Sequence, residues 1–184
     1  MYAQLNTKTV FSFMDATVKL TDYITAAKTL GYQTLGISDV DNLHAAHQFI
    51  TQAKAAGIQP VIGYETTLLL DGLAINFTFI AKTNAGLQNL YSISSKKNFG
   101  YNNFSDIHSH LCDVALILPA DSAVDSILTH LPQNDVFVGL AQPMAQGFLR
   151  PTIPFLSVRY LNAGDAETLA ILHHVKNGTK YDDS

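Results

Sequence analysis

Short apolar segments of strand length alternate with segments of helical periodicity along nearly the whole chain, and this alternation constrains the fold most strongly. Leu20, Ile24, Ala27 and Leu30, for example, recur at helical spacing, and Gly31 follows as a residue that commonly ends helices. Strands separated by helices form βαβ units around a parallel sheet. The pattern therefore predicts an α/β fold. Seven strands are expected, within 2–16 (ending at residues 6–9) and at 34–38, 60–70, 75–81, 114–118, 136–140 and 153–158.

About six helices and one hairpin complete this prediction. Asp41 or Asn42 is expected to cap a helix that ends at Gly57, and Asn84 to cap another. Asp71-Gly72 between two apolar runs is a hairpin signal, so the two strands beside it should be antiparallel. The remaining helices are expected at 20–30, 106–111, 121–131 and 165–175, and polar loops at 94–103 and 141–150.

The composition indicates a globular protein of the reducing cytoplasm. The chain has 184 residues, of which 47% are hydrophobic and 14% charged, so it can bury a sizeable core. A single cysteine, Cys112, excludes an internal disulfide, and no segment has the length of a membrane span. The net charge of −4 argues against a free-standing nucleic-acid binder. We therefore expect one cytoplasmic domain over residues 1–184, without membrane contact.

Functional groups of parallel α/β folds gather at the carboxyl ends of strands, which directs attention to a few polar positions. These are residues 6–8, 39–40 and 157–159, together with Glu65 and Asp121. A metal-dependent hydrolase needs several converging carboxylates or imidazoles there. The available acids are Asp15, Asp39, Glu65 and Asp121, and no histidine lies at a predicted strand end.

Two other groups of residues have ordinary structural explanations. His44 and His47 are spaced i, i+3 on a predicted helix, but a surface or packing role accounts for them without a metal. Lys96 and Lys97 lie beside two aromatic residues in the predicted loop 94–103 and could contact a phosphate or a base. A solvated loop is the commoner explanation for such a segment.

Four ordered blocks of the chain carry a resemblance to a known family. Residues 2–16, 36–65, 79–95 and 157–183 resemble the N-terminal PHP (polymerase and histidinol phosphatase) domain of bacterial DNA polymerase III alpha subunits of the DnaE type. The resemblance implies a distorted seven-stranded (β/α) barrel, in agreement with the predicted strand count. It also implies that residues 1–184 form a single PHP domain at the front end of a much longer polymerase.

The resemblance also marks where a metal cluster would lie in active members of the family. The matching positions are Asn6, Lys8, Asp15, Val40, Glu65, Lys97, Asp121, Ser157 and Arg159. Only Asp15 and Glu65, with Asp121 as a third, keep a residue type that ligates metal. We therefore expect these positions to be vestigial, with no metal and no catalytic residue in this domain. Lys8 and Arg159 are expected to form salt bridges with the remaining carboxylates in place of the metals.

The function that the resemblance implies is a structural and interaction module of a replicative DNA polymerase. Its expected partners are the remaining domains of the alpha subunit, with a proofreading exonuclease subunit or DNA as further candidates. No cofactor is expected here, because the Mg²⁺ of the polymerase reaction would bind elsewhere in the parent chain. The alternative is a metal-dependent phosphoesterase or 3′–5′ exonuclease that uses a reduced site at Asp15, Glu65 and Asp121.

Overall fold

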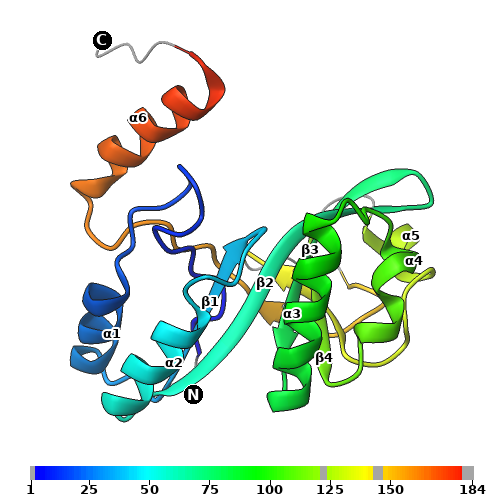
Figure 1. Ribbon diagram of the computed structural model, residues 1–184, viewed down its shortest axis with the longest axis horizontal. Helices are drawn as coiled ribbons and strands as arrows, with labels where there is room; N and C mark the ends of the chain where they lie inside the picture. Colours follow the sequence, from blue (N-terminus) through cyan, green and yellow to red (C-terminus); the bar gives the residue numbers. More distant parts are fainter. Residues whose placement is uncertain (1–2, 121–123, 143–146, 180–184) are drawn as a thin grey trace.

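The computed structural model describes residues 3–120, 124–142 and 147–179, in which helices and strands alternate (Figure 1). The strands are β1 (Thr34–Val40), β2 (Gln59–Leu70), β3 (Leu73–Ala81), β4 (Val114–Pro119), β5 (Val136–Leu140) and β6 (Thr152–Pro154). The helices are α1 (Leu20–Thr29), α2 (Ala46–Ala55), α3 (Asn84–Asn98), α4 (Phe104–Ile107), α5 (Val124–Leu128) and α6 (Asp165–Asn177), with a 3₁₀ turn at His108–His110.

One curled, mixed sheet contains all six of these strands in sequence order. The pairs β1–β2, β4–β5 and β5–β6 are parallel, whereas β3 runs antiparallel to both of its neighbours. The hairpin predicted at Asp71-Gly72 is confirmed, since Leu70 pairs with Leu73 and both turn residues have positive φ angles of 52° and 81°. The α/β class predicted from the sequence is therefore confirmed.

The hydrophobic core lies between this sheet and the helices α2 and α3, which Figure 1 shows in front of β1 to β3. Phe49 of α2, Leu90 and Ile93 of α3, and Tyr64 and Leu68 of β2 are all buried in it. Because side chains alternate between the two faces of a strand, Glu65 of β2 points away from these helices. The same strand thus supplies the core on one face and a charged group on the other.

The opening segment, residues 3–9, does not form the regular first strand that the sequence predicts. It makes isolated bridges, Gln4 to Leu35 on β1 and Thr7 to Val158. Ser38 donates its N–H to Thr7 at 2.9 Å, while Lys8 donates its N–H to Val158 at 2.9 Å. The segment therefore joins β1 to the chain that follows β6. Its register against β1 slips by one residue, because Gly36 and Ser38 donate their N–H groups to Gln4 and Thr7, and no continuous ladder forms. The structure has six strands, and the predicted seventh is absent from the described residues.

The final predicted strand is also shorter than expected. Only residues 152–154 belong to β6. Phe155 still donates its N–H to the Leu140 backbone oxygen at 2.8 Å, and the chain leaves β5 after that bond. Val158, predicted as the end of this strand, pairs instead with Thr7.

Three helix boundaries differ from the prediction for identifiable reasons. The helix α2 begins at Ala46, because the Asn42 side chain accepts from the His44 N–H and donates to Phe11 and Val40 in a separate turn. As a result, His44 precedes the helix that carries His47. Thr83, rather than Asn84, caps α3. That helix continues to Asn98, because residues 94–98 contain neither glycine nor proline, so the predicted loop there was wrong.

The last helix lies apart from the helices that cover the sheet. Figure 1 shows α6 beside the turn of residues 10–15 and away from α2 and α3. Leu169 is its buried residue, so little apolar surface holds it in place. Within the described ranges, none of the helices has both the length and the apolar character needed to cross a membrane.

Replacing Gly36 with alanine should weaken the contact between β1 and the opening segment. A Cβ at this position would lie 2.9 Å from Leu5 Cα, a backbone atom that moves only if the segment moves. We expect Gly36→Ala to lower the free energy of unfolding by about 1–3 kcal/mol, measured by urea denaturation. Gly147→Ala, whose Cβ would meet nothing within 4 Å, is the matched control and should change it by less than about 0.5 kcal/mol. Equal stability of the two variants would contradict this account.

Candidate functional site

A cavity of about 510 Å³ lies beyond the carboxyl ends of β4 and β5, where parallel α/β folds place their functional groups. Its polar lining includes Asn6 from the opening segment, Glu65 from β2, and Ser157 and Arg159 from the chain after β6. These are four of the nine positions that the resemblance marks. The fold therefore brings together residues that are about 150 positions apart in the sequence.

Lys8 lies at the centre of this group with a fully buried side chain. Its Nζ donates to three oxygens, Glu65 Oε2 at 2.5 Å, the backbone oxygen of Ser38 at 2.5 Å and Asn6 Oδ1 at 2.8 Å. An ammonium group has three protons, so this set satisfies it completely. One cation thus binds the opening segment, β1 and β2 to each other.

The Glu65 carboxylate is held as firmly as its partner. Asn76 Nδ2 donates to Oε1 at 3.1 Å, and Thr78 Oγ1 lies 3.4 Å from Oε2, both from the neighbouring strand β3. Burial lowers the pKa of the Lys8 ammonium, and the charge of Glu65 opposes this shift. The carboxylate therefore offsets part of the effect that burial has on the Lys8 ammonium.

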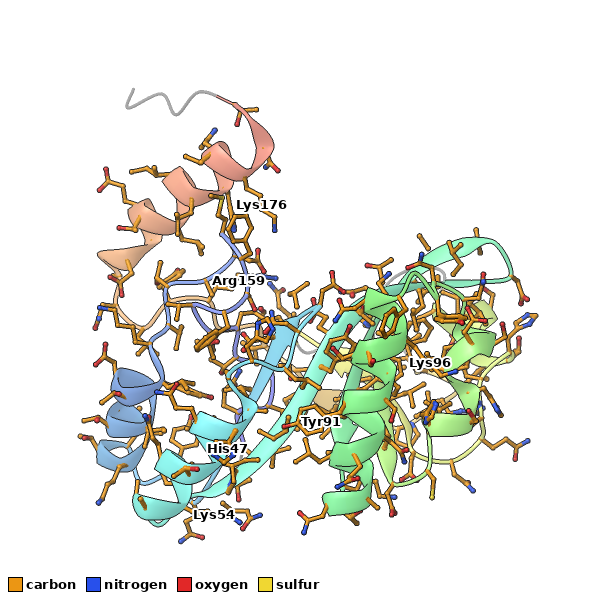
Figure 2. The ribbon with its side chains drawn as sticks, in the orientation of Figure 1. His47, Lys54, Tyr91, Lys96, Arg159 and Lys176 are labelled. Carbon is orange, nitrogen blue, oxygen red and sulfur yellow. The ribbon has the colours of Figure 1, made fainter. Side chains whose placement is uncertain are left out.

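A second ion pair lies towards the outside of the cavity. Arg159 Nη1 donates to Asp15 Oδ2 at 2.6 Å, and both side chains are partly exposed. His173 Nε2 of α6 lies 3.3 Å from the other Asp15 oxygen, without the orientation of a hydrogen bond. Figure 2 shows Arg159 below α6, on the side of the opening segment. Asp15 therefore links the cavity wall to the last helix.

Asp39 has a structural role at the end of β1. Its buried carboxylate accepts from the Thr9 N–H at 2.6 Å, from Thr9 Oγ1 at 2.8 Å and from Ser12 Oγ at 2.7 Å. Ser12 Oγ in turn accepts from the Val40 N–H. These bonds fasten the turn that follows the opening segment, and they leave Asp39 little capacity for a ligand.

The remaining predicted positions fall in three different places. Val40 pairs with Glu65 in the sheet, so it lies beside the ion pair but brings no polar side chain. Lys97 donates to the Thr67 backbone oxygen and to Asn102 Oδ1, and no contact joins it to the cavity group within the described structure. Asp121 lies outside the described residues.

The residues at this site do not fit a metal cluster. In the part of the chain that the structure describes, no group of three or more His, Cys, Asp or Glu side chains is arranged to hold a metal ion. The two carboxylates that would serve as ligands, Glu65 and Asp15, each contact a fixed cation instead. A metal ion near Glu65 would meet the buried Lys8 ammonium, and like charges repel strongly in such an environment.

Sequence reasoning missed the residues that support this arrangement. Asn76 and Thr78 hold Glu65, and Thr9 and Ser12 hold Asp39. Asn76 and Thr78 share one strand face two positions apart, opposite Glu65, and this alternation is the signal that would have found them. Thr9 and Ser12 gave no signal, because the turn that carries them depends on a carboxylate 27 to 30 residues away.

The fold and the site together define an α/β domain whose strand-end cavity holds lysine and arginine against its carboxylates. The PHP domain model matches residues 4–138, so this chain belongs to the PHP domain family. The chain is 36% identical over 180 residues to the DNA polymerase III subunit alpha of Streptococcus pyogenes serotype M3, a match that covers 96% of this chain. It is 32% identical over 194 residues to the corresponding subunit of Staphylococcus epidermidis, covering 99% of this chain.

Both matches involve only part of the relative. The chain spans 17% of the length of each of these curated relatives. Among solved structures, an amidohydrolase from Chromobacterium violaceum is similar with a TM-score of 0.47 and 9% identity, over 92% of this chain and 96% of that chain. That likeness is too distant to support a functional inference.

Removing the charge of Lys8 should destabilise the fold. We expect Lys8→Met to lower the free energy of unfolding by roughly 3–5 kcal/mol, because it leaves the Glu65 carboxylate buried without its cation. Lys8→Met/Glu65→Gln should recover part of this loss, since no unpaired charge remains. Urea denaturation measures both, with the exposed Lys54→Met as the control. A Lys8→Met variant as stable as the wild type would show that the pair contributes little.

Removing the Asp15 carboxylate should loosen α6. Asp15→Ala loses the ion pair with Arg159 and the contact with His173, and little apolar burial remains to hold the helix. We expect faster amide hydrogen exchange within residues 165–177, measured by mass spectrometry, and unchanged exchange in α3. Asp22→Ala on the exposed side of α1 is the control. If exchange in α6 matches that of the wild type, the helix is held by other contacts.

Proposed function

We propose that this chain is the PHP domain of a bacterial DNA polymerase III alpha subunit and serves that polymerase as a structural and interaction module without a metal cluster. The family membership and the two polymerase relatives support the first half of this proposal. Because the chain spans 17% of those relatives, nucleotidyl transfer and its Mg²⁺ are assigned to other parts of the parent chain.

The observation that carries the metal-free role is the buried contact between Lys8 and Glu65. A metal cluster supplies positive charge to converging carboxylates, and here the Lys8 ammonium supplies it from within the chain. The ammonium also donates to Asn6 and Ser38. These bonds fix its position, as expected of a structural cation, whereas a catalytic lysine needs freedom to reach a substrate. The charge of the lost metals is thereby replaced by a group that holds the fold together.

The partners that follow from this role are the remaining domains of the alpha subunit. A proofreading exonuclease subunit and DNA are further candidates. Bacterial replication takes place in the cytoplasm, so the proposed function also assigns the protein there, without membrane contact.

Metal binding tests the proposal directly. We expect purified chain to contain no stoichiometric metal by elemental analysis and to give no saturable heat with zinc or manganese in calorimetry, because Lys8 and Arg159 already neutralise the carboxylates. Asn6→His/Lys8→His is the matched contrast. It places two imidazoles beside Glu65, a donor set that zinc accepts, so it should bind zinc more tightly than the wild type. Stoichiometric zinc or manganese in the wild-type chain would overturn the metal-free role.

An activity assay addresses the alternative of a phosphoesterase or 3′–5′ exonuclease with a reduced site. We expect no phosphatase or exonuclease activity from this chain with added manganese, because Asp15 and Glu65 are both held by cations. A manganese-dependent activity that disappears in Asp15→Asn would establish the alternative in place of the structural role.

A further inference from the structure

A group of exposed aromatic rings and half-buried lysines lies at the carboxyl end of α3, away from the cavity and its ion pairs. We call Lys96, Lys97, Phe99 and Tyr101 the aromatic–lysine patch. Phe99 is 82% exposed and Tyr101 is 51% exposed, although aromatic residues ordinarily bury most of their surface. Neither ring is needed for the core, which is complete without them.

The backbone holds these residues in a defined arrangement. The helix ends at Asn98, and Gly100 turns the chain with a φ of 88°, a conformation that favours glycine. The Tyr101 N–H then returns to donate to the Lys96 carbonyl oxygen at 3.1 Å. Phe99 and Tyr101 therefore flank a tight turn and are not part of a loose loop.

The two lysines are positioned by neutral oxygens. Lys96 Nζ lies 5.4 Å from the centre of the Tyr101 ring and donates to the Asp106 backbone oxygen at 3.0 Å. Lys97 Nζ donates to the Thr67 backbone oxygen at 2.8 Å and to Asn102 Oδ1 at 2.7 Å. It lines a shallow cavity of about 270 Å³ with Leu68 and Leu69 of β2.

The charges of both lysines remain open to a ligand. Over the described ranges, neither ammonium forms an ion pair with a carboxylate, whereas the nearby Asp106 carboxylate is engaged at the start of α4 by Asn103. The dipole of α3 favours lysines in its last turn, and this accounts for their presence. It does not account for two exposed rings beside them.

We propose that the aromatic–lysine patch binds single-stranded nucleic acid, with bases stacked on Phe99 and Tyr101 and phosphates near Lys96 and Lys97. Exposed rings next to fixed, unpaired cations are the combination that single strands require, because an unpaired base offers a free face and its phosphate a negative charge. A duplex, whose bases are already stacked, would gain nothing from the rings. This site is separate from the cavity and does not depend on the metal-free role.

The net charge of −4 limits how tightly such a patch can bind. Affinity should be in the range of non-specific binding, on the order of 10⁻⁴ to 10⁻⁶ M, and strongly dependent on salt. For two phosphate contacts, the logarithm of the binding constant should fall with the logarithm of the salt concentration with a slope of about −1.4.

The test is fluorescence anisotropy of a labelled oligothymidylate of about 12 nucleotides, titrated at low salt with the 184-residue chain. Phe99→Ala should weaken binding at least about fivefold through the lost stacking. Lys96→Ala should reduce the magnitude of the salt slope by about 0.7, because one phosphate contact is lost. Melting temperatures equal to that of the wild type would show that the variants remain folded.

The controls are an exposed phenylalanine and an exposed lysine elsewhere. Phe13 is 75% exposed, and Lys54 lies on α2, far from Lys96 in Figure 2. Phe13→Ala and Lys54→Ala should bind as the wild type does. The proposal is wrong if the wild-type chain does not bind the oligonucleotide at low salt, which is the result expected of a protein-docking surface. It is also wrong if the controls weaken binding as much as Phe99→Ala, or if a duplex of equal length binds equally well.

Discussion

The buried contact between Lys8 and Glu65 is the interaction on which the rest of the structure depends. The opening segment makes isolated bridges and forms no regular strand, yet it carries the lysine whose ammonium reaches Asn6, β1 and β2. Burying a charge is unfavourable unless partners surround it, and here every proton of the ammonium has one. The pair therefore decides where the opening segment lies, and with it the shape of the cavity.

The two ion pairs of the cavity have different physical roles. Lys8 and Glu65 are shielded from water, so their interaction is strong and breaking it leaves an uncompensated charge. Arg159 and Asp15 are partly exposed, so their attraction is weaker and contributes mainly through position, as the link between the cavity wall and α6. One ion pair of the site thus holds the inside of the domain together, and the other positions its last helix.

The prediction from sequence succeeded where local chemistry decides the structure. The Asp71-Gly72 turn needs positive φ at two residues, and the alternation of β and α segments follows from side-chain periodicity, so both could be predicted. The prediction failed where residues far away in the sequence determine the local structure. The α2 start depends on how Asn42 bonds to Phe11, and the register of the opening segment against β1 slips between Gln4 and Thr7. The predicted loop at 94–103 was wrong over residues 94–98 for a local reason, since these residues include neither glycine nor proline and their lysines suit the last turn of a helix.

The predictions about the candidate site also separate into those that residue identity could support and those that needed the tertiary structure. The sequence by itself determined the α/β class and the polar residues at the predicted strand ends, because these depend on residue identity and order. Only the tertiary structure decided that Lys8 contacts Glu65, that Arg159 contacts Asp15, and that Lys97 faces Thr67 away from both. The physical reason is that a charge finds its partner through the packing of segments far apart in the chain, and residue spacing carries no information about that distance.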